Sequence, residues 1–173
     1  MRVVSTIALV LTLAAIPKAF GATDLPRKTK TPRETYPNVD VIYDLVTTPR
    51  GERLRTIITK PREVRGKLPV IFVAGWLSCD TVEAPPDKDP GPGVVRHDAT
   101  GLAFREIAQM PGFCFFRVDK QGVGDSEGDC AKNNFESELD GYRAAFRALK
   151  NYDLIDTNQV YIVESATAAD LGL

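Results

Sequence analysis

The sequence predicts an α/β fold in which an antiparallel hairpin leads into a mostly parallel sheet with crossover helices. Two segments rich in Val, Ile and Thr, residues 39–48 and 54–60, flank a turn that contains Pro49 and Gly51. This pattern is typical of a hairpin. After it, short apolar segments alternate with helical patterns, which favours parallel strands joined by right-handed crossovers. A length of 173 residues, 43% of them apolar, fits one globular domain.

Residues 1–21 have the pattern of a secretory signal peptide. Arg2 gives a positive start, residues 3–16 form an apolar run, and Ala19 and Gly21 are small residues just before the expected cleavage site. The apolar run is short for a membrane-spanning helix, and a retained amino-terminal anchor helix is the alternative. We therefore expect a periplasmic or extracellular chain in an oxidising compartment, without a membrane partner after cleavage.

The rest of the chain divides into a polar leader, residues 22–38, and one domain, residues 39–173. The leader is rich in proline, lysine and arginine, so we expect it to be extended and mobile. Within the domain, residues 69–74 form a continuous apolar run, which is typical of a strand buried on both faces. The density of proline and glycine in residues 77–95 excludes a helix or a central strand and predicts a long loop.

The second half of the domain continues the alternation of helix and strand. Residues 99–110 carry apolar side chains at a rough helical period and end before Pro-Gly, which predicts a helix. Residues 113–118 predict a second buried strand. Residues 153–158 are expected to form the loop into a last strand at residues 160–163.

The clearest helix is predicted over residues 135–152. Its apolar side chains recur at intervals of four and three residues, which is the pattern of one helix face packed on a core. Acidic residues come early and basic residues late, as the helix dipole favours. Asn133 or Asn134 is expected to cap its first turn.

Three cysteines suit an oxidising compartment, and their odd number leaves one unpaired. Cys79 and Cys130 each lie in a loop just after a predicted strand, whereas Cys114 lies inside an apolar strand and is expected to be a buried thiol. We therefore predict a disulfide between Cys79 and Cys130. The alternative, no disulfide at all, stays open because sequence does not give the geometry.

Residues 119–128 follow a buried strand directly and read Asp-Lys-Gln-Gly-Val-Gly-Asp-Ser-Glu-Gly. The closely spaced glycines permit a sharp turn with positive φ. A dinucleotide-binding fingerprint would need glycine in place of Glu127, and no phosphate-binding Gly-Lys-Ser/Thr is present. At this turn the chain resembles the α/β-hydrolase superfamily, above all its secreted serine peptidases and esterases. The resemblance covers residues 39–163, the amino-terminal half of such a domain.

The resemblance assigns roles to single residues of this chain. In the family, the oxyanion loop usually contains His-Gly followed by an apolar residue. In this chain Ala74 replaces the histidine, while Gly75 and Trp76 follow the pattern. The backbone N–H of Trp76 is then an oxyanion donor, and a packed aromatic side chain is the alternative role. The same resemblance makes Asp119, Gly122, Gly124 and Ser126 a structural turn beside the site, with Ser126 as a turn hydroxyl.

The family's nucleophile elbow has the sequence Gly-x-Ser-x-Gly, and this motif is missing after residues 160–163. Glu164 stands at the first glycine and Ala166 at the nucleophile, so that position is not functional. Ser165 lies one residue away and would act only in a slipped register. The family's acid and histidine follow the nucleophile, whereas His97, the only histidine, precedes it and is expected to be a surface loop residue.

A frameshift near codon 163 is one explanation for the altered elbow. Codons exist for residues 163–172 that, with one inserted base, read Val-Gly-Ile-Ser-Asn-Gly-Gly-Gly-Phe-Gly, which restores the motif. The resemblance therefore implies a secreted serine hydrolase of carboxylic ester or peptide bonds, truncated at the elbow and inactive as this chain. Its substrates would be small-molecule esters or peptides.

Two other functions remain open from the sequence. In the first, the chain is a non-catalytic secreted fragment or a binding module that uses the loop 77–95. In the second, it is a thiol enzyme that uses Cys79 or Cys130, although a histidine partner for either cysteine is lacking. A net charge of −1 gives no basic surface for nucleic acid. One histidine without neighbouring ligands argues against a zinc site, and we expect no cofactor.

Overall fold

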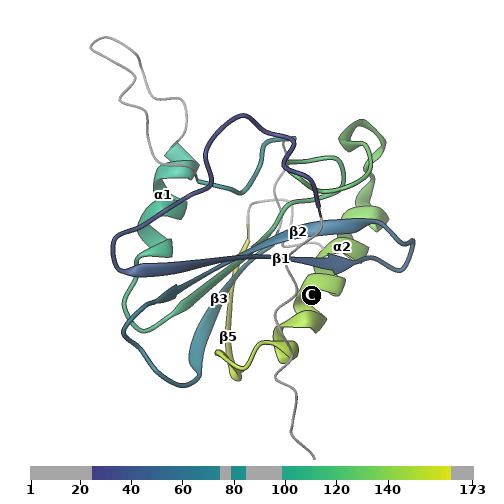
Figure 1. Ribbon diagram of the computed structural model, residues 1–173. Helices are drawn as coiled ribbons and strands as arrows, with labels where there is room; N and C mark the ends of the chain where they lie inside the picture. Colours follow the sequence, from purple (N-terminus) through teal and green to yellow (C-terminus); the bar gives the residue numbers. More distant parts are fainter. Residues whose placement is uncertain (1–24, 75–78, 85–98, 165–173) are drawn as a thin grey trace, which may run out of the picture.

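A computed structural model describes residues 25–74, 79–84 and 99–164, which form a sheet between two helices (Figure 1). Helix α1 covers one face of the sheet and helix α2 the other. The elements in chain order are β1 (Val39–Thr47), β2 (Arg53–Pro61), β3 (Leu68–Ala74), α1 (Ala99–Ala108), β4 (Cys114–Val118), α2 (Phe135–Ala148) and β5 (Ile155–Glu164), with short 3-10 turns at Cys130–Lys132 and Leu149–Asn151.

The strand order in the sheet is β1-β2-β4-β3-β5. Strand β2 pairs antiparallel with both β1 and β4, whereas β4, β3 and β5 run parallel to one another. The predicted fold class, a hairpin that leads into a mostly parallel sheet, is therefore confirmed. Parallel strands end at the same edge, so Ala74, Val118 and Glu164 mark one border of the sheet. We call this border the carboxyl edge.

The core has two layers because side chains of each strand alternate between the two faces. On the α2 side, Phe72 stacks on Phe116 with ring centroids 5.6 Å apart, and its ring also meets the edge of Phe146. On the α1 side, Phe115 packs against Phe104. All residues of β4 are buried, and four of the five are apolar, the exception being the buried Arg117.

Helix α2 begins at a complete capping box. The side chain of Asn134 accepts a hydrogen bond from the backbone N–H of Ser137 at 3.0 Å, and the Ser137 hydroxyl accepts one from the Asn134 N–H at 2.9 Å. Of the two candidate caps, Asn134 is therefore the one used. The helix ends at Ala148, one turn earlier than predicted, because residues 149–151 tighten into a 3-10 turn.

Replacing Asn134 with alanine should lower the free energy of unfolding by about 1 kcal/mol, because the first turn of α2 loses its side-chain acceptor. Urea unfolding followed by circular dichroism measures this change. The exposed Asn151, substituted in the same way, should change stability by less than about 0.5 kcal/mol. Equal losses in both variants would contradict a capping role.

The prediction of a mobile leader is wrong for residues 25–36, which we call the strap. The strap contains no regular helix or strand, yet Leu25, Glu34 and Tyr36 are all buried. Two of its charged side chains leave solvent: Glu34 is buried against Arg117 of the sheet, and the half-buried Arg27 pairs with Glu83 of a loop. The other charged residues of the strap stay exposed, namely Lys28, Lys30 and Arg33. The strap crosses the upper part of the molecule in Figure 1.

The last strand also differs from the prediction, because β5 begins at Ile155 rather than at residue 160. Ile155 pairs with Leu68, but the next pair joins Val160 to Val70, so extra residues of β5 bulge out between the two pairs. Asp156 holds this bulge by accepting hydrogen bonds from the Asn158 N–H and from Gln159. The polar residues read as a loop are therefore an irregularity within the strand.

Within the described ranges, no helix has the length and apolar character needed to cross a membrane.

Candidate functional site

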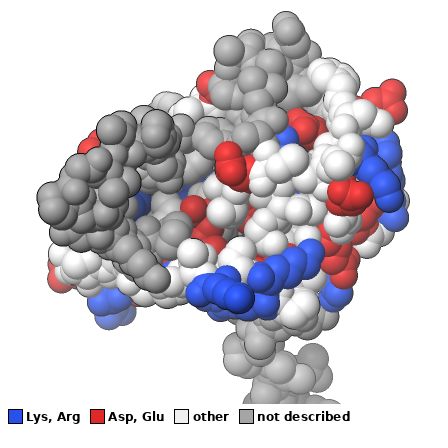
Figure 2. All heavy atoms as spheres, turned by 90° about the horizontal axis from the view of Figure 1, so that it is seen from above, with Lys and Arg blue, Asp and Glu red and all other residues white. Residues whose placement is uncertain are grey.

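The segments that carry the family motifs leave the sheet at the carboxyl edge. Ala74 pairs with Glu164 across the parallel strands β3 and β5, so the chain after each strand departs from adjacent positions. Trp76, His97, Ser165 and Ala166 lie outside the described residues. Figure 2 views the molecule from above, with acidic side chains near the middle of this face and lysine and arginine side chains along its border.

The turn after β4 is built around Ser126 and two glycines. The Ser126 hydroxyl donates to the Asp119 carbonyl at 2.9 Å and accepts from the Arg55 N–H at 2.8 Å, and its side chain is fully buried. In the described structure Ser126 is thus a turn hydroxyl. Gly122 and Gly124 both have positive φ, 73° and 54°, and a Cβ at Gly124 would lie 2.1 Å from the Asp119 carboxylate.

Asp119 joins this turn to the described part of the loop after β3, residues 79–84, which we call the exit segment. The buried carboxylate of Asp119 accepts hydrogen bonds from the Thr81 hydroxyl at 2.9 Å and from the Val82 N–H at 2.8 Å. Burial raises the pKa of Asp119 to about 6, while the hydrogen bonds from Val82 and Thr81 act in the opposite direction. Asp119 is therefore a support for the neighbouring loop rather than an exposed acid.

The raised pKa predicts a pH dependence of stability. Because the folded pKa lies above the value of about 3.9 for an unfolded aspartate, the folded chain binds more protons than the unfolded chain between these values. The contribution of Asp119 to stability therefore decreases as pH rises from about 4 to about 6. In Asp119→Asn this component disappears, so the change in the free energy of unfolding across that window should differ from the parent's by on the order of 3 kcal/mol.

Urea unfolding at several pH values compares Asp119→Asn with the parent chain. Substitution of the exposed Asp153 by asparagine is the matched control, and its stability curve should run parallel to that of the parent. Parallel curves for Asp119→Asn as well would contradict the raised pKa.

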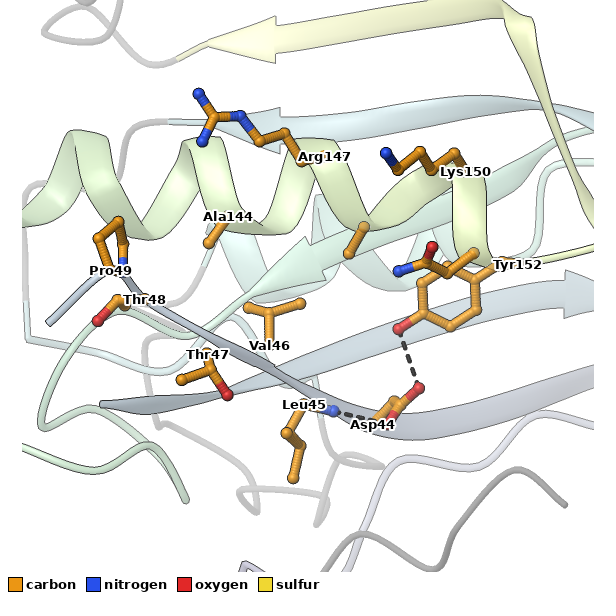
Figure 3. Close-up of a pocket in the computed structure, with 12 residues that line it drawn as sticks. Asp44, Leu45, Val46, Thr47, Thr48, Pro49, Ala144, Arg147, Lys150 and Tyr152 are labelled. Atoms are coloured by element: carbon orange, nitrogen blue, oxygen red, sulfur yellow. Dashed lines mark hydrogen bonds between the residues drawn. The ribbon is translucent and has the colours of Figure 1, made fainter. Parts of the chain in front are cut away.

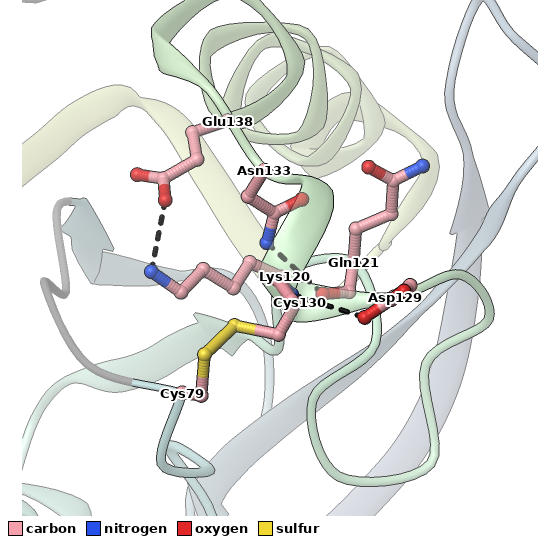
Figure 4. The surroundings of a disulfide bond; sticks show 8 residues. Cys79, Lys120, Gln121, Asp129, Cys130, Asn133 and Glu138 are labelled. Carbon is pink, nitrogen blue, oxygen red and sulfur yellow. Dashed lines mark hydrogen bonds and ion pairs between the residues drawn. A yellow bond between two sulfur atoms is a disulfide. The ribbon is translucent and has the colours of Figure 1, made fainter.

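A disulfide connects the exit segment to the 3-10 turn Cys130–Lys132, which comes just after the glycine turn that follows β4. Cys79 and Cys130 are bonded, with their Cα atoms 6.0 Å apart (Figure 4). Nearby, Lys120 lies 2.9 Å from the Glu138 carboxylate of α2, and Asn133 donates to the Gln121 carbonyl at 3.0 Å. The bond leaves neither Cys79 nor Cys130 as a free thiolate, so a thiol enzyme that uses either residue is not supported by this structure.

Cys114 is the free cysteine, and it is fully buried in β4. Burial raises the pKa of its thiol to about 11. The thiolate that nucleophilic catalysis needs is therefore disfavoured.

Sequence reasoning missed a set of buried charges around the exit segment. Glu34 of the strap pairs with Arg117 of β4, and both side chains are inaccessible to solvent. Glu83 of the exit segment accepts a hydrogen bond from Tyr43 and pairs with Arg27 of the strap at 2.7 Å. Burial, with the neighbouring Glu83 carboxylate, raises the pKa of Tyr43. No local pattern marks these pairs, because their members are far apart in the sequence.

A groove of about 540 Å³ lies elsewhere, between β1 and α2 (Figure 3). Thr47 lines it from the strand, Thr48 from the turn that follows, and Ala144 and Arg147 from the helix, while at one end Tyr152 donates to the Asp44 carboxylate at 3.0 Å. None of its lining residues belongs to the exit segment or to the turn after β4. Among the described residues, no group of His, Cys, Asp and Glu side chains could hold a metal ion.

Comparisons with known proteins find similarity at the level of structure. No family model and no curated protein matches the sequence. A hypothetical protein, PA2218 from Pseudomonas aeruginosa, superposes with a TM-score of 0.54 at 16% identity, over 91% of this chain and 40% of that one. Oligopeptidase B from Trypanosoma brucei, with covalently bound antipain, gives a TM-score of 0.56 at 12% identity, over 78% and 18%.

The alpha/beta hydrolase GrgF from Penicillium sp. sh18 is similar to the same extent. Its TM-score is 0.52 at 14% identity, over 79% of this chain and 40% of that one. The chain thus spans less than half the length of each of these three structures.

Proposed function

Since the described residues have part of the α/β-hydrolase fold, we propose that this chain is the amino-terminal part of a secreted serine hydrolase that cleaves carboxylic ester or peptide bonds. The fold alone does not determine a reaction, and the proposal therefore depends on the arrangement of the strand ends. The structural neighbours support the fold on which the proposal is based, and the substrate has to be found by experiment.

The observation that carries the proposal is the pairing of Ala74 with Glu164 at the carboxyl edge. Neighbouring strands lie about 4.8 Å apart. A backbone donor just after β3 and a nucleophile just after β5 would therefore start from adjacent positions. Acyl transfer requires this proximity, because the donor must stabilise the negative charge that forms when the nucleophile attacks the carbonyl carbon.

In this proposal the Trp76 N–H is the oxyanion donor, and the turn from Asp119 to Ser126 supports the loop that contains it. Asp119 contributes through its hydrogen bonds to Thr81 and Val82 rather than by proton transfer. Ser165 is the serine adjacent to the nucleophile position, which Ala166 occupies. A histidine base and an orienting acid would complete the reaction.

A fluorophosphonate probe tests catalysis by this chain. Labelling of a peptide that contains Ser165, and its loss in Ser165→Ala, would support a serine hydrolase. Substitution of Ser137 by alanine is the control, since it removes a hydroxyl from the first turn of α2, outside the exit segment and the turn after β4, and should leave labelling in place in folded protein. Absence of labelling in the parent chain would contradict catalysis here and favour a non-catalytic binding module.

The coding DNA around codon 163 tests the frameshift explanation. We expect a shifted frame that encodes Gly-x-Ser-x-Gly and continues into an acid and a histidine. The repaired gene would then be assayed for esterase and peptidase activity. Codons that do not give this reading would exclude the frameshift.

Export is the second part of the proposal, and the pattern of residues 1–21 and the bond between Cys79 and Cys130 support it. Protein recovered from the periplasm or the culture fluid should begin at Ala22 and carry one disulfide by mass spectrometry. An intact amino terminus in the cytoplasmic fraction would contradict export.

A further inference from the structure

The exit segment has no helix or strand in its described residues, and side chains from other elements hold it in place. Arg117 donates to the Val82 carbonyl at 2.9 Å, and Arg105 donates to the Ala84 carbonyl at 2.9 Å. The Ala84 N–H in turn donates to the Glu34 carboxylate at 2.8 Å. Backbone groups that would be paired within a helix or a sheet are therefore satisfied by charged side chains.

Glu34 is central to this arrangement because it bridges the exit segment and the sheet. One of its oxygens accepts hydrogen bonds both from the Ala84 N–H at 2.8 Å and from Arg117 at 3.0 Å. Arg117 also lies over the Phe115 ring, with its guanidinium carbon 4.7 Å from the centroid. The attraction within a buried ion pair offsets the free energy of desolvation only when additional hydrogen bonds satisfy both charged groups. Here the exit segment supplies these hydrogen bonds.

The strap makes a second attachment through Arg27 and Lys28. Arg27 contacts the Glu83 carboxylate of the exit segment at 2.7 Å and the Asp125 carboxylate of the turn after β4 at 3.2 Å. The Lys28 N–H donates to Asp125 at 2.8 Å, and the Lys28 side chain donates to the Ser126 carbonyl. The strap therefore bridges two loops that both leave the carboxyl edge.

We infer that the strap is a brace that positions the exit segment against the turn after β4, with Glu34 and Arg27 as positioning residues. In the proposed hydrolase, on which this role rests, the exit segment continues directly from the residues that resemble the oxyanion loop. An oxyanion donor must be held within about 0.5 Å of its productive place. A brace of buried ion pairs supplies such rigidity where the backbone has no regular structure.

Hydrogen exchange with mass spectrometry tests the brace without requiring catalysis. In Arg27→Met the amides of the exit segment should exchange at least about tenfold faster, while amides of β3 and β4 change by less than about twofold. Glu34→Gln should also accelerate the exit segment, but it leaves the buried Arg117 of β4 without its carboxylate, so the comparison with β3 and β4 is made in Arg27→Met. Arg62→Met is the matched control, because it removes an exposed ion pair with Asp40 on the β1–β2 hairpin and should leave the exit segment unchanged.

Two outcomes would overturn the brace. One is unchanged exchange of the exit segment in both variants. The other is an equal acceleration of the exit segment, β3 and β4 in Arg27→Met, since this would show that the strap adds only general stability.

Fluorophosphonate labelling of the same variants separates the brace from the proposed function. If the parent chain is labelled, the labelling rate should fall at least about tenfold in Arg27→Met and stay unchanged in Arg62→Met. If the parent chain is not labelled, Ser165 is not a nucleophile in this chain, and the exchange experiment alone decides on the brace.

Discussion

Replacing Arg117 with methionine should lower the free energy of unfolding by about 3 to 5 kcal/mol. The guanidinium is completely buried, and its removal leaves the Glu34 carboxylate in the interior without an opposite charge. The Val82 carbonyl loses its donor as well. Urea unfolding of the disulfide-bonded chain, followed by tryptophan fluorescence and circular dichroism, measures the loss.

Two further variants identify the cause of this loss. In Glu34→Met/Arg117→Met both charges are absent, and the double variant should recover at least about 1 kcal/mol relative to Arg117→Met. Arg62→Met removes an exposed pair and should cost less than about 1 kcal/mol. A double variant less stable than Arg117→Met would contradict the explanation by an unpaired buried charge.

Replacing Gly122 with alanine should cost about 3 kcal/mol or more, because two penalties add. Its φ of 73° lies in the left-handed region that side chains disfavour. A Cβ would also lie 2.1 Å from the backbone nitrogen of Cys130 and 2.6 Å from the carbonyl carbon of Asp129, and backbone atoms cannot rotate away. Thermal unfolding measures the loss, and a thiol assay should show a smaller fraction of chains with the bond between Cys79 and Cys130.

Gly66 is the matched control for this substitution. Its φ of 92° is also positive, but a Cβ there would meet nothing within 4 Å. Alanine at Gly66 should therefore cost only the backbone penalty of about 1 to 2 kcal/mol. Losses of equal size at the two glycines would show that crowding at Cys130 is not responsible.

Local patterns were sufficient to predict the sheet and the helix α2. The apolar run in β3 and the intervals of four and three residues in α2 reflect burial that each segment shows by itself. The predicted start of β5 was wrong because Asp156, Asn158 and Gln159 are residue types that are typical of a turn. Their side chains do form a turn, but as a bulge inside a strand that Ile155 has already joined to β3.

The candidate site was predictable only in part. The glycines at positions 122 and 124 indicated a sharp turn at the end of a strand, and the structure has positive φ at both. The burial of Glu34 had no such signal. A glutamate in a polar, proline-rich leader is usually solvated, and its partner Arg117 is 83 residues away. Contacts of this kind depend on the finished sheet, which brings together elements that the sequence separates.

The strap also sets an order of events during synthesis. Lys28 leaves the ribosome long before Ser126, which lies 98 residues later and accepts its hydrogen bond. At the usual 5–20 residues per second this delay is roughly 5 to 20 s. Throughout that interval the leader emerges first but has no binding site, because β4 and the following turn do not yet exist. The strap is thus made well before the turn that holds it and is among the last segments to reach its native place, so a chaperone would meet it as an extended, charged segment.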